Sequence, residues 1–120
     1  MELELELEIV DSRGVKVVFC RGKLVIGKEV EYFKSKIEGL LPEFPNIVLE
    51  LKGLRRIDSQ GVGAIVTLLN KARESGGDVK LASVSQGYVH KVLEVTKMPT
   101  VFQIFDDERQ AVSAFAKTGT

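Results

Sequence analysis

The sequence predicts an α/β fold, built as a single domain over residues 1–120. Strand-like segments alternate with segments of helical period, and glycines and prolines separate them. A turn-forming segment also separates the first two strand-like segments, which is typical of a β-hairpin. A chain of 120 residues that is 44% hydrophobic can bury one continuous core but is too short for two ordinary domains.

The N-terminal segment alternates leucine or isoleucine with glutamate from residue 3 to residue 9. This period of two is that of a strand with one face in the core. Turn-forming residues at 11–14 follow, and residues 15–20 form a β-branched run that returns beside the first strand. We therefore expect the fold to open with an antiparallel hairpin.

The period then changes to that of a helix over residues 28–40, which Pro42 and Pro45 end. The short apolar segment 47–51 is bounded by breakers, as expected of a central strand covered on both faces. A second helix is predicted over 60–74 from one apolar stripe. That stripe consists of Val62, Ile65, Val66, Leu69 and Ala72.

Four more segments complete the prediction: a strand at 79–84, a short helix around 89–93, a strand at 101–105 and a helix at 107–117. The expected order is β-β-α-β-α-β-α-β-α, with about four helices. Strands that alternate with helices need crossovers that return in the same direction. The sheet should therefore be mixed, with an N-terminal hairpin and mostly parallel strands beyond it.

The composition argues against several classes of function. Seventeen basic and seventeen acidic residues balance, so no positive field would attract nucleic acid. The N-terminus lacks the pattern of a signal peptide, and no apolar stretch approaches the roughly 20 residues that span a bilayer. We predict a cytoplasmic protein without direct membrane insertion, whose single Cys20 is a buried apolar residue.

Few residues could support catalysis. His90 is the only histidine, and it lies on the expected outer face of a helix, away from any nucleophile. One Cys and one His cannot hold zinc, so neither a metal nor another cofactor is expected. Gly61 and Gly63 resemble the start of a dinucleotide fingerprint, but Val66 replaces its third glycine. The enzyme alternative is a small hydrolase or nucleotide-dependent enzyme at this glycine junction; we predict no catalytic residues.

Asp58 and Ser59 lie where a strand passes into a helix. The N–H groups of a helix N-terminus bind anions, so a phosphate on Ser59 would fit there. The simpler interpretation is that one of the two residues caps the helix. Glycines in the first turn lower helix propensity, which indicates the close approach of a partner, a phosphate or the neighbouring strand. Arg55 and Arg56, just upstream, could pair with that phosphate or an acidic partner, or be solvated loop charges.

This junction resembles the hallmark of the STAS domain family: an apolar strand (47–51), a short connection (54–57) and an Asp-Ser-x-Gly-hydrophobic-Gly sequence (58–63). The resemblance extends over nearly the whole chain. It includes Gly22, the Gly76-Gly77 pair, and the segments 92–98 and 101–105.

The resemblance implies an anti-sigma factor antagonist. In that branch of the family, an anti-sigma factor that is also a serine kinase phosphorylates the serine matching Ser59, and a serine phosphatase reverses the reaction. The unphosphorylated form binds the kinase and frees the sigma factor, which controls sigma-factor-dependent transcription. Ser59 is therefore the implied phosphorylation site. The implied partner-binding residues are Asp58, Ser59, Gln60, Gly61, Val62, Gly63, Arg56, Gly22 and Val25.

An alternative from the same family is a subunit of another assembly, either stressosome-like or accessory to a lipid transporter, that docks proteins without phosphorylation. The sequence does not decide between a monomer and a weak dimer. Ala64 and Leu68 lie off the apolar stripe of the second helix. They are expected either to extend an apolar docking face near Ser59 or to be packed by the neighbouring helix.

Overall fold

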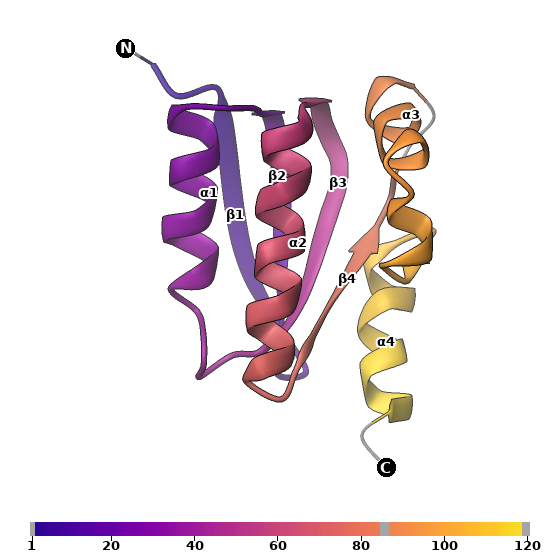
Figure 1. Cartoon of the computed structure of the whole chain (residues 1–120). Helices are drawn as coiled ribbons and strands as arrows, with labels where there is room; N and C mark the ends of the chain where they lie inside the picture. Colours follow the sequence, from indigo (N-terminus) through magenta and orange to yellow (C-terminus); the bar gives the residue numbers. More distant parts are fainter. Residues whose placement is uncertain (1, 85–86, 119–120) are drawn as a thin grey trace.

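A five-stranded sheet with helices on both faces forms the domain (Figure 1). The computed structural model describes residues 2–84 and 87–118, the last two by their backbone alone. The predicted fold class and element order are confirmed. The elements are β1 (Leu5–Ser12), β2 (Val15–Leu24), α1 (Lys28–Glu38), β3 (Asn46–Ile57), α2 (Ser59–Glu74), β4 (Asp78–Ala82), α3 (Tyr88–Val95), the 3-10 helix η1 (Met98–Thr100), β5 (Ile104–Phe105) and α4 (Glu108–Thr118).

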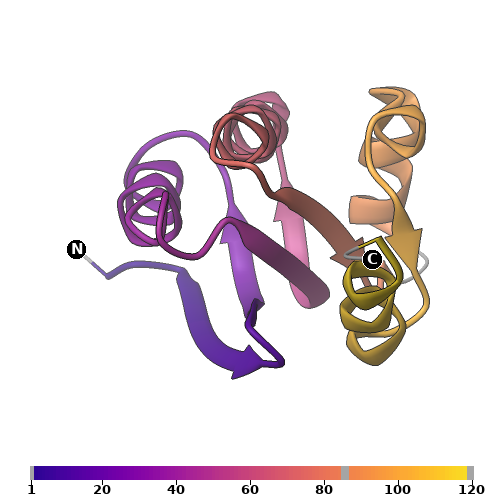
Figure 2. The same ribbon diagram turned by 90° about the horizontal axis from the view of Figure 1, so that it is seen from below.

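The strands lie in the sheet in the order in which they occur in the chain, β1-β2-β3-β4-β5. The first pair is antiparallel and every later pair is parallel, as predicted. Helices α1 and α2 lie side by side on one face of the sheet, and α4 lies on the other (Figure 2). The carboxyl ends of the parallel strands therefore point toward one end of the domain.

Two hydrophobic clusters fill the space on the two faces of the sheet. The main cluster lies between the sheet and helices α1, α2 and α3, and includes Phe33, Leu49 and Leu93. The smaller one lies under α4 and joins Val17 and Val48 to Ala111 and Val112. Cys20 belongs to the main cluster, where burial, reinforced by the charge of Glu50, raises the pKa of its thiol to about 12.

The hairpin is tighter than the sequence indicated. Strand β1 continues to Ser12, which pairs with Val15 across a loop of only two residues. Arg13 and Gly14 in this loop both have positive φ angles, 56° and 81°, as a type I′ turn requires. This geometry matches the twist of the two strands and so allows pairing up to the turn.

Strand β3 is longer than the predicted 47–51, because it continues through residue 57 beside β2. Its pairing is interrupted by irregularities between Phe19 and Arg21 and between Gly22 and Lys23. Arg55 and Arg56 consequently lie on a strand and not in a loop. The residue following this strand is Asp58, so β3 leads directly into the junction.

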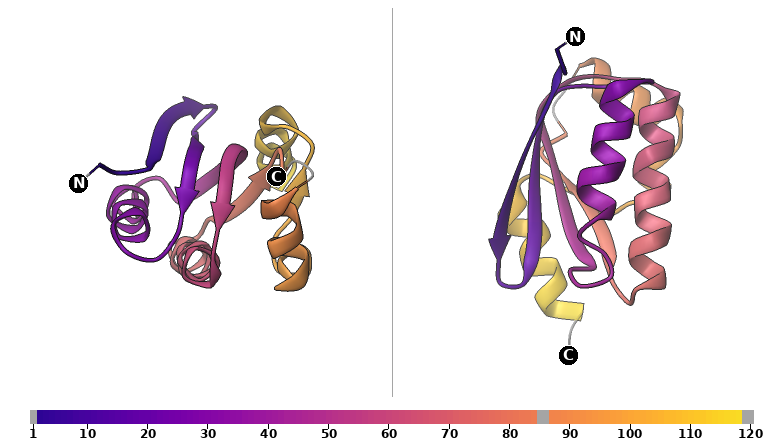
Figure 3. Two further views of the ribbon diagram at one scale, coloured as in Figure 1. Left: turned by 90° about the horizontal axis from the view of Figure 1, so that it is seen from above. Right: turned by 90° about the vertical axis from the view of Figure 1, so that its left-hand side faces the viewer.

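Of the two possibilities for Ala64 and Leu68, the docking face is wrong and packing by the neighbouring helix is correct. Both residues are buried, 4% and 0% exposed, in the main cluster. Helix α1 lies directly beside α2 (Figure 3) and covers a second stripe of that helix. The stripe predicted from sequence is buried except for Val66, which is half-buried.

The C-terminal elements differ from prediction mainly in their ends. The last strand is two residues long, since the 3-10 helix η1 and the turn after it occupy the segment that leads to it. Helix α4 begins at Glu108, where Asp107 caps it by accepting a hydrogen bond from the N–H of Gln110 at 2.9 Å. No helix in the described parts of the chain is both long and apolar enough to cross a bilayer.

Candidate functional site

The junction between β3 and α2 lies at the end of the domain where β2 and β3 terminate (Figure 1, upper end). Ser59 is the first residue of the 16-residue helix α2 and is exposed to solvent. The unpaired N–H groups of this helix end and its dipole create a positive potential around the hydroxyl. A phosphate on Ser59 would be stabilised there.

Asp58 is the N-cap of α2, so the capping interpretation is correct for Asp58. It has extended backbone angles, and its Oδ1 accepts a hydrogen bond from the N–H of Gly61 at 2.9 Å. Its Oδ2 accepts a second bond, also 2.9 Å, from the N–H of Ile26 in the β2–α1 loop. One carboxylate thus ties together the helix end and the neighbouring loop.

The two glycines of the first turn of α2 have different surroundings. A Cβ on Gly61 would lie 2.2 Å from the carbonyl oxygen of Leu24 and 2.8 Å from Cγ1 of Ile57. A Cβ on Gly63 would have no neighbour within 4 Å. The close approach of the neighbouring strand explains why residue 61 is a glycine. At residue 63, no neighbouring atom within the domain requires a glycine, and Gly63 is exposed.

The structure sorts the predicted partner-binding residues by exposure. Arg56, Ser59, Gln60 and Gly63 are exposed, and Gly22, Val25 and Asp58 are half-buried. Gly61 and Val62 are buried and face the core. Gly22, at φ 105°, is crossed by the backbone of Glu4, whose carbonyl oxygen would lie 2.1 Å from an added Cβ. The exposed subset forms the surface around Ser59.

Two further side chains at this end were missed by the sequence analysis. Ile26 in the β2–α1 loop is 67% exposed, and Tyr88 at the start of α3 is 55% exposed. The ring centroid of Tyr88 lies 5.9 Å from Cζ of Arg56. A single apolar residue in a loop gives no periodic signal, so only the topology brings these residues to the junction.

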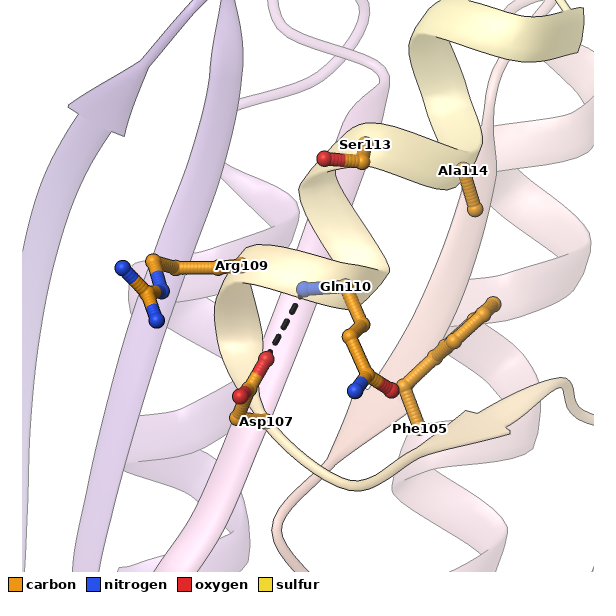
Figure 4. A pocket seen from close by; sticks show the side chains of 6 residues that line it. All are labelled: Phe105, Asp107, Arg109, Gln110, Ser113 and Ala114. Atoms are coloured by element: carbon orange, nitrogen blue, oxygen red, sulfur yellow. Dashed lines mark hydrogen bonds between the residues drawn. The ribbon is translucent and has the colours of Figure 1, made fainter.

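The hollow at the start of α4 is a weaker candidate for a site. It has a volume of about 490 Å³ and is lined by Phe105, Asp107, Arg109, Gln110, Ser113 and Ala114 (Figure 4). Asp107 is the one carboxylate among these lining residues, and it already caps α4. No residue singled out in the sequence lines it.

The described residues give little support for metal binding or for catalysis by His90 or Cys20. Within residues 2–84 and 87–118, no three His, Cys, Asp or Glu side chains lie close enough together to hold a metal ion. His90 lies 3.9 Å from Glu94 one turn along α3, an ordinary surface pair. The high pKa of Cys20 keeps its thiol protonated and unreactive.

Comparisons with known proteins agree with this geometry. The family model described as "STAS domain" matches residues 6–111. A curated "Anti-sigma F factor antagonist" of Paenibacillus polymyxa is 26% identical over 113 residues, which cover 92% of this chain and 95% of the relative. A crystal structure of a putative anti-sigma factor antagonist from Thermotoga maritima has a TM-score of 0.74 at 29% identity and covers 92% of each chain.

The chain therefore belongs to the STAS domain family, and the relatives it matches include anti-sigma factor antagonists. Two structures of the antagonist SpoIIAA also resemble this chain. The unphosphorylated form has a TM-score of 0.68, and the phosphorylated form, from Bacillus, has a TM-score of 0.69. The identities are 20% and 21%, and the matches cover 94% and 92% of this chain and 97% and 98% of those chains. These two likenesses show the shared fold.

Proposed function

We propose that this protein is a cytoplasmic partner-switching protein that binds an anti-sigma factor serine kinase while Ser59 is unphosphorylated. Phosphorylation of Ser59 releases the kinase, and a serine phosphatase restores the binding form. Sigma-factor-dependent transcription follows from this exchange. The domain, spanning 1–120, acts by binding as a monomer or weak dimer and contributes no catalytic residue of its own.

The observation that carries the proposal is the exposure of Ser59 at the N-terminus of α2 in a STAS protein whose relatives include an anti-sigma F factor antagonist. A kinase needs an accessible hydroxyl, and Ser59 is accessible. A phosphate adds a charge of about −1.5 to −2 and three acceptor oxygens at the centre of the surface. A closely fitted partner would then face an uncompensated charge that is costly to desolvate.

The direct test is affinity capture from a lysate of the source cells, with the retained proteins identified by mass spectrometry. The baits are the wild type, Ser59→Asp and the matched control Ser35→Asp, which places the same charge on an exposed residue of α1. We expect an ATP-binding serine kinase on the wild type and the control but not on Ser59→Asp.

Equal retention of a different assembly by all three baits would contradict the proposal. That outcome would support the alternative, a subunit of a stressosome-like or lipid-transporter complex. Retention of no kinase by the wild type would also contradict the proposed function. Nucleotide turnover by the purified domain, lost in Gly63→Val, would favour the enzyme alternative.

A further inference from the structure

Three exposed side chains lie near the β3–α2 junction, each on a segment that ends or follows a different parallel strand. Ile26 follows β2, Arg56 is the next-to-last residue of β3, and Tyr88 begins α3 after β4. Contacts link all three to the junction. Ile26 is bonded through its backbone to Asp58, and Tyr88 lies against Arg56.

Ile26 is displayed on an anchored loop. Its N–H is held by Oδ2 of Asp58 at 2.9 Å, and the preceding Val25 accepts a hydrogen bond from the N–H of Val30 at 3.2 Å. Its side chain nevertheless remains 67% exposed. An apolar side chain on an anchored backbone can bind a pocket with little loss of backbone conformational entropy.

The guanidinium of Arg56 is an exposed positive charge at this end. Among the described residues, no ion pair involves Arg56, and its contact is with the Tyr88 ring. The adjacent carboxylate, Asp58, already accepts two backbone hydrogen bonds. On β2, by contrast, Arg21 and Lys23 pair with glutamates of the N-terminal segment at 3.0 and 2.9 Å.

We propose that the partner presents an acidic group to Arg56 and an apolar pocket to Ile26 and Tyr88, and that a phosphate on Ser59 works by cancelling this attraction. This inference rests on the proposed function and names the chemistry of the kinase surface. Arg56 and Asp58 together carry no net charge, so a phosphate on Ser59 brings the charge of this surface to about −1.5 to −2. An acidic partner surface is then repelled.

Salt dependence follows from this arrangement. Attraction between exposed charges is screened over about 10 Å at 0.1 M salt, so binding of the unmodified protein weakens as salt rises. The apolar contacts of Ile26 and Tyr88 are insensitive to screening. Charge and apolar contributions can therefore be separated by measurements on the same complex.

The test uses the purified kinase identified by the capture experiment and measures its Kd at low and high salt. The variants are Arg56→Gln, Ile26→Ser and the matched control Arg55→Gln. Arg55 precedes Arg56 on β3, but lines a groove on the β1–β2 side together with Leu3, Arg21 and Gly53. Urea midpoints of all variants establish that each is folded.

We expect Arg56→Gln to weaken binding about tenfold at low salt and to flatten the salt dependence, with Arg55→Gln unchanged. Ile26→Ser should weaken binding and leave the salt dependence as it is. Equal Kd values for Arg56→Gln and the wild type, or a Kd independent of salt, would overturn this inference. Sensitivity to Ser59→Asp would then still support the proposed function, whereas a wild type that binds no kinase would overturn both.

Discussion

The two ends of the sheet differ in how the described charged side chains are paired. At the end that carries Ser59, Arg56 has no ion pair among the described residues, and large apolar side chains are exposed. At the other end, Asp78 accepts from Arg73 at 3.2 Å and from the buried Lys80 at 3.3 Å. The second end thus satisfies its charges internally, whereas the first leaves them available.

The difference separates residues that hold the domain together from residues that an interaction can use. Lys80 is packed against Gln103 and the ring of Phe115, whose centroid lies 4.5 Å from its Nζ. Substitutions there should act on stability. At the Ser59 end, exposed residues should act on binding, while Asp58 and Gly61 should still act on stability.

The largest expected effect distinguishes the two glycines of α2. Gly61→Ala forces a methyl group against the backbone of Leu24 and should lower the free energy of unfolding by about 3 kcal/mol. Gly63→Ala meets nothing and should raise it by about 0.5–1 kcal/mol through helix propensity. Urea denaturation measures both. Similar effects at the two positions would contradict the different surroundings described for them.

At the opposite end, Asp78→Ala should lower the free energy of unfolding by about 2 kcal/mol, because it leaves the Lys80 ammonium buried without its carboxylate. Lys80→Met keeps the volume, removes the charge and serves as the control. It should be nearly neutral. If Lys80→Met costs as much as Asp78→Ala, packing and not charge compensation dominates this end.

Removal of the cap should have an intermediate effect. Asp58→Ala loses the bonds to Gly61 and Ile26 and should cost about 1 kcal/mol, while Asp58→Asn keeps one acceptor oxygen and should cost less. Hydrogen exchange gives the specific measurement. The amides of Ile26 and Gly61 should lose protection in Asp58→Ala, and unchanged exchange at Ile26 would argue against the link to the loop.

The smallest effect concerns pH. The N–H of Glu4 donates to Glu29 and holds the pKa of that carboxyl below its usual range. A lowered folded-state pKa stabilises the domain above the ordinary glutamate pKa, and that stability is lost as pH falls through the lowered value. The stability difference between wild type and Glu29→Gln should therefore shrink from about pH 7 to about pH 3. A constant difference would contradict this.

The order of elements could be predicted because hydrophobic period and breakers are local properties of the chain. The full length of β3 could not, since Lys52, Gly53, Arg55 and Arg56 hide the strand pattern where β2 bulges beside it. The burial of Ala64 and Leu68 depends on α1, a helix more than twenty residues earlier.

The sequence predicted only part of the candidate site, because only the local features of the chain leave a pattern in it. The Asp58–Gly63 sequence marks the junction because capping and glycine requirements are local. Ile26 and Tyr88 are distant in sequence and carry no pattern of their own. Only the folded arrangement of the strands brings Ile26 to Asp58 and Tyr88 to Arg56.

The identity of strand order and chain order bears on how the protein emerges from the ribosome. Each new strand finds its neighbour already synthesised, so the sheet can grow strand by strand from the N-terminal hairpin. The apolar face formed by Val17 and Val48 is different, because its cover includes Ala111 and Val112 of α4, the last helix of the domain. We expect this face to be accessible to chaperones until α4 has been synthesised.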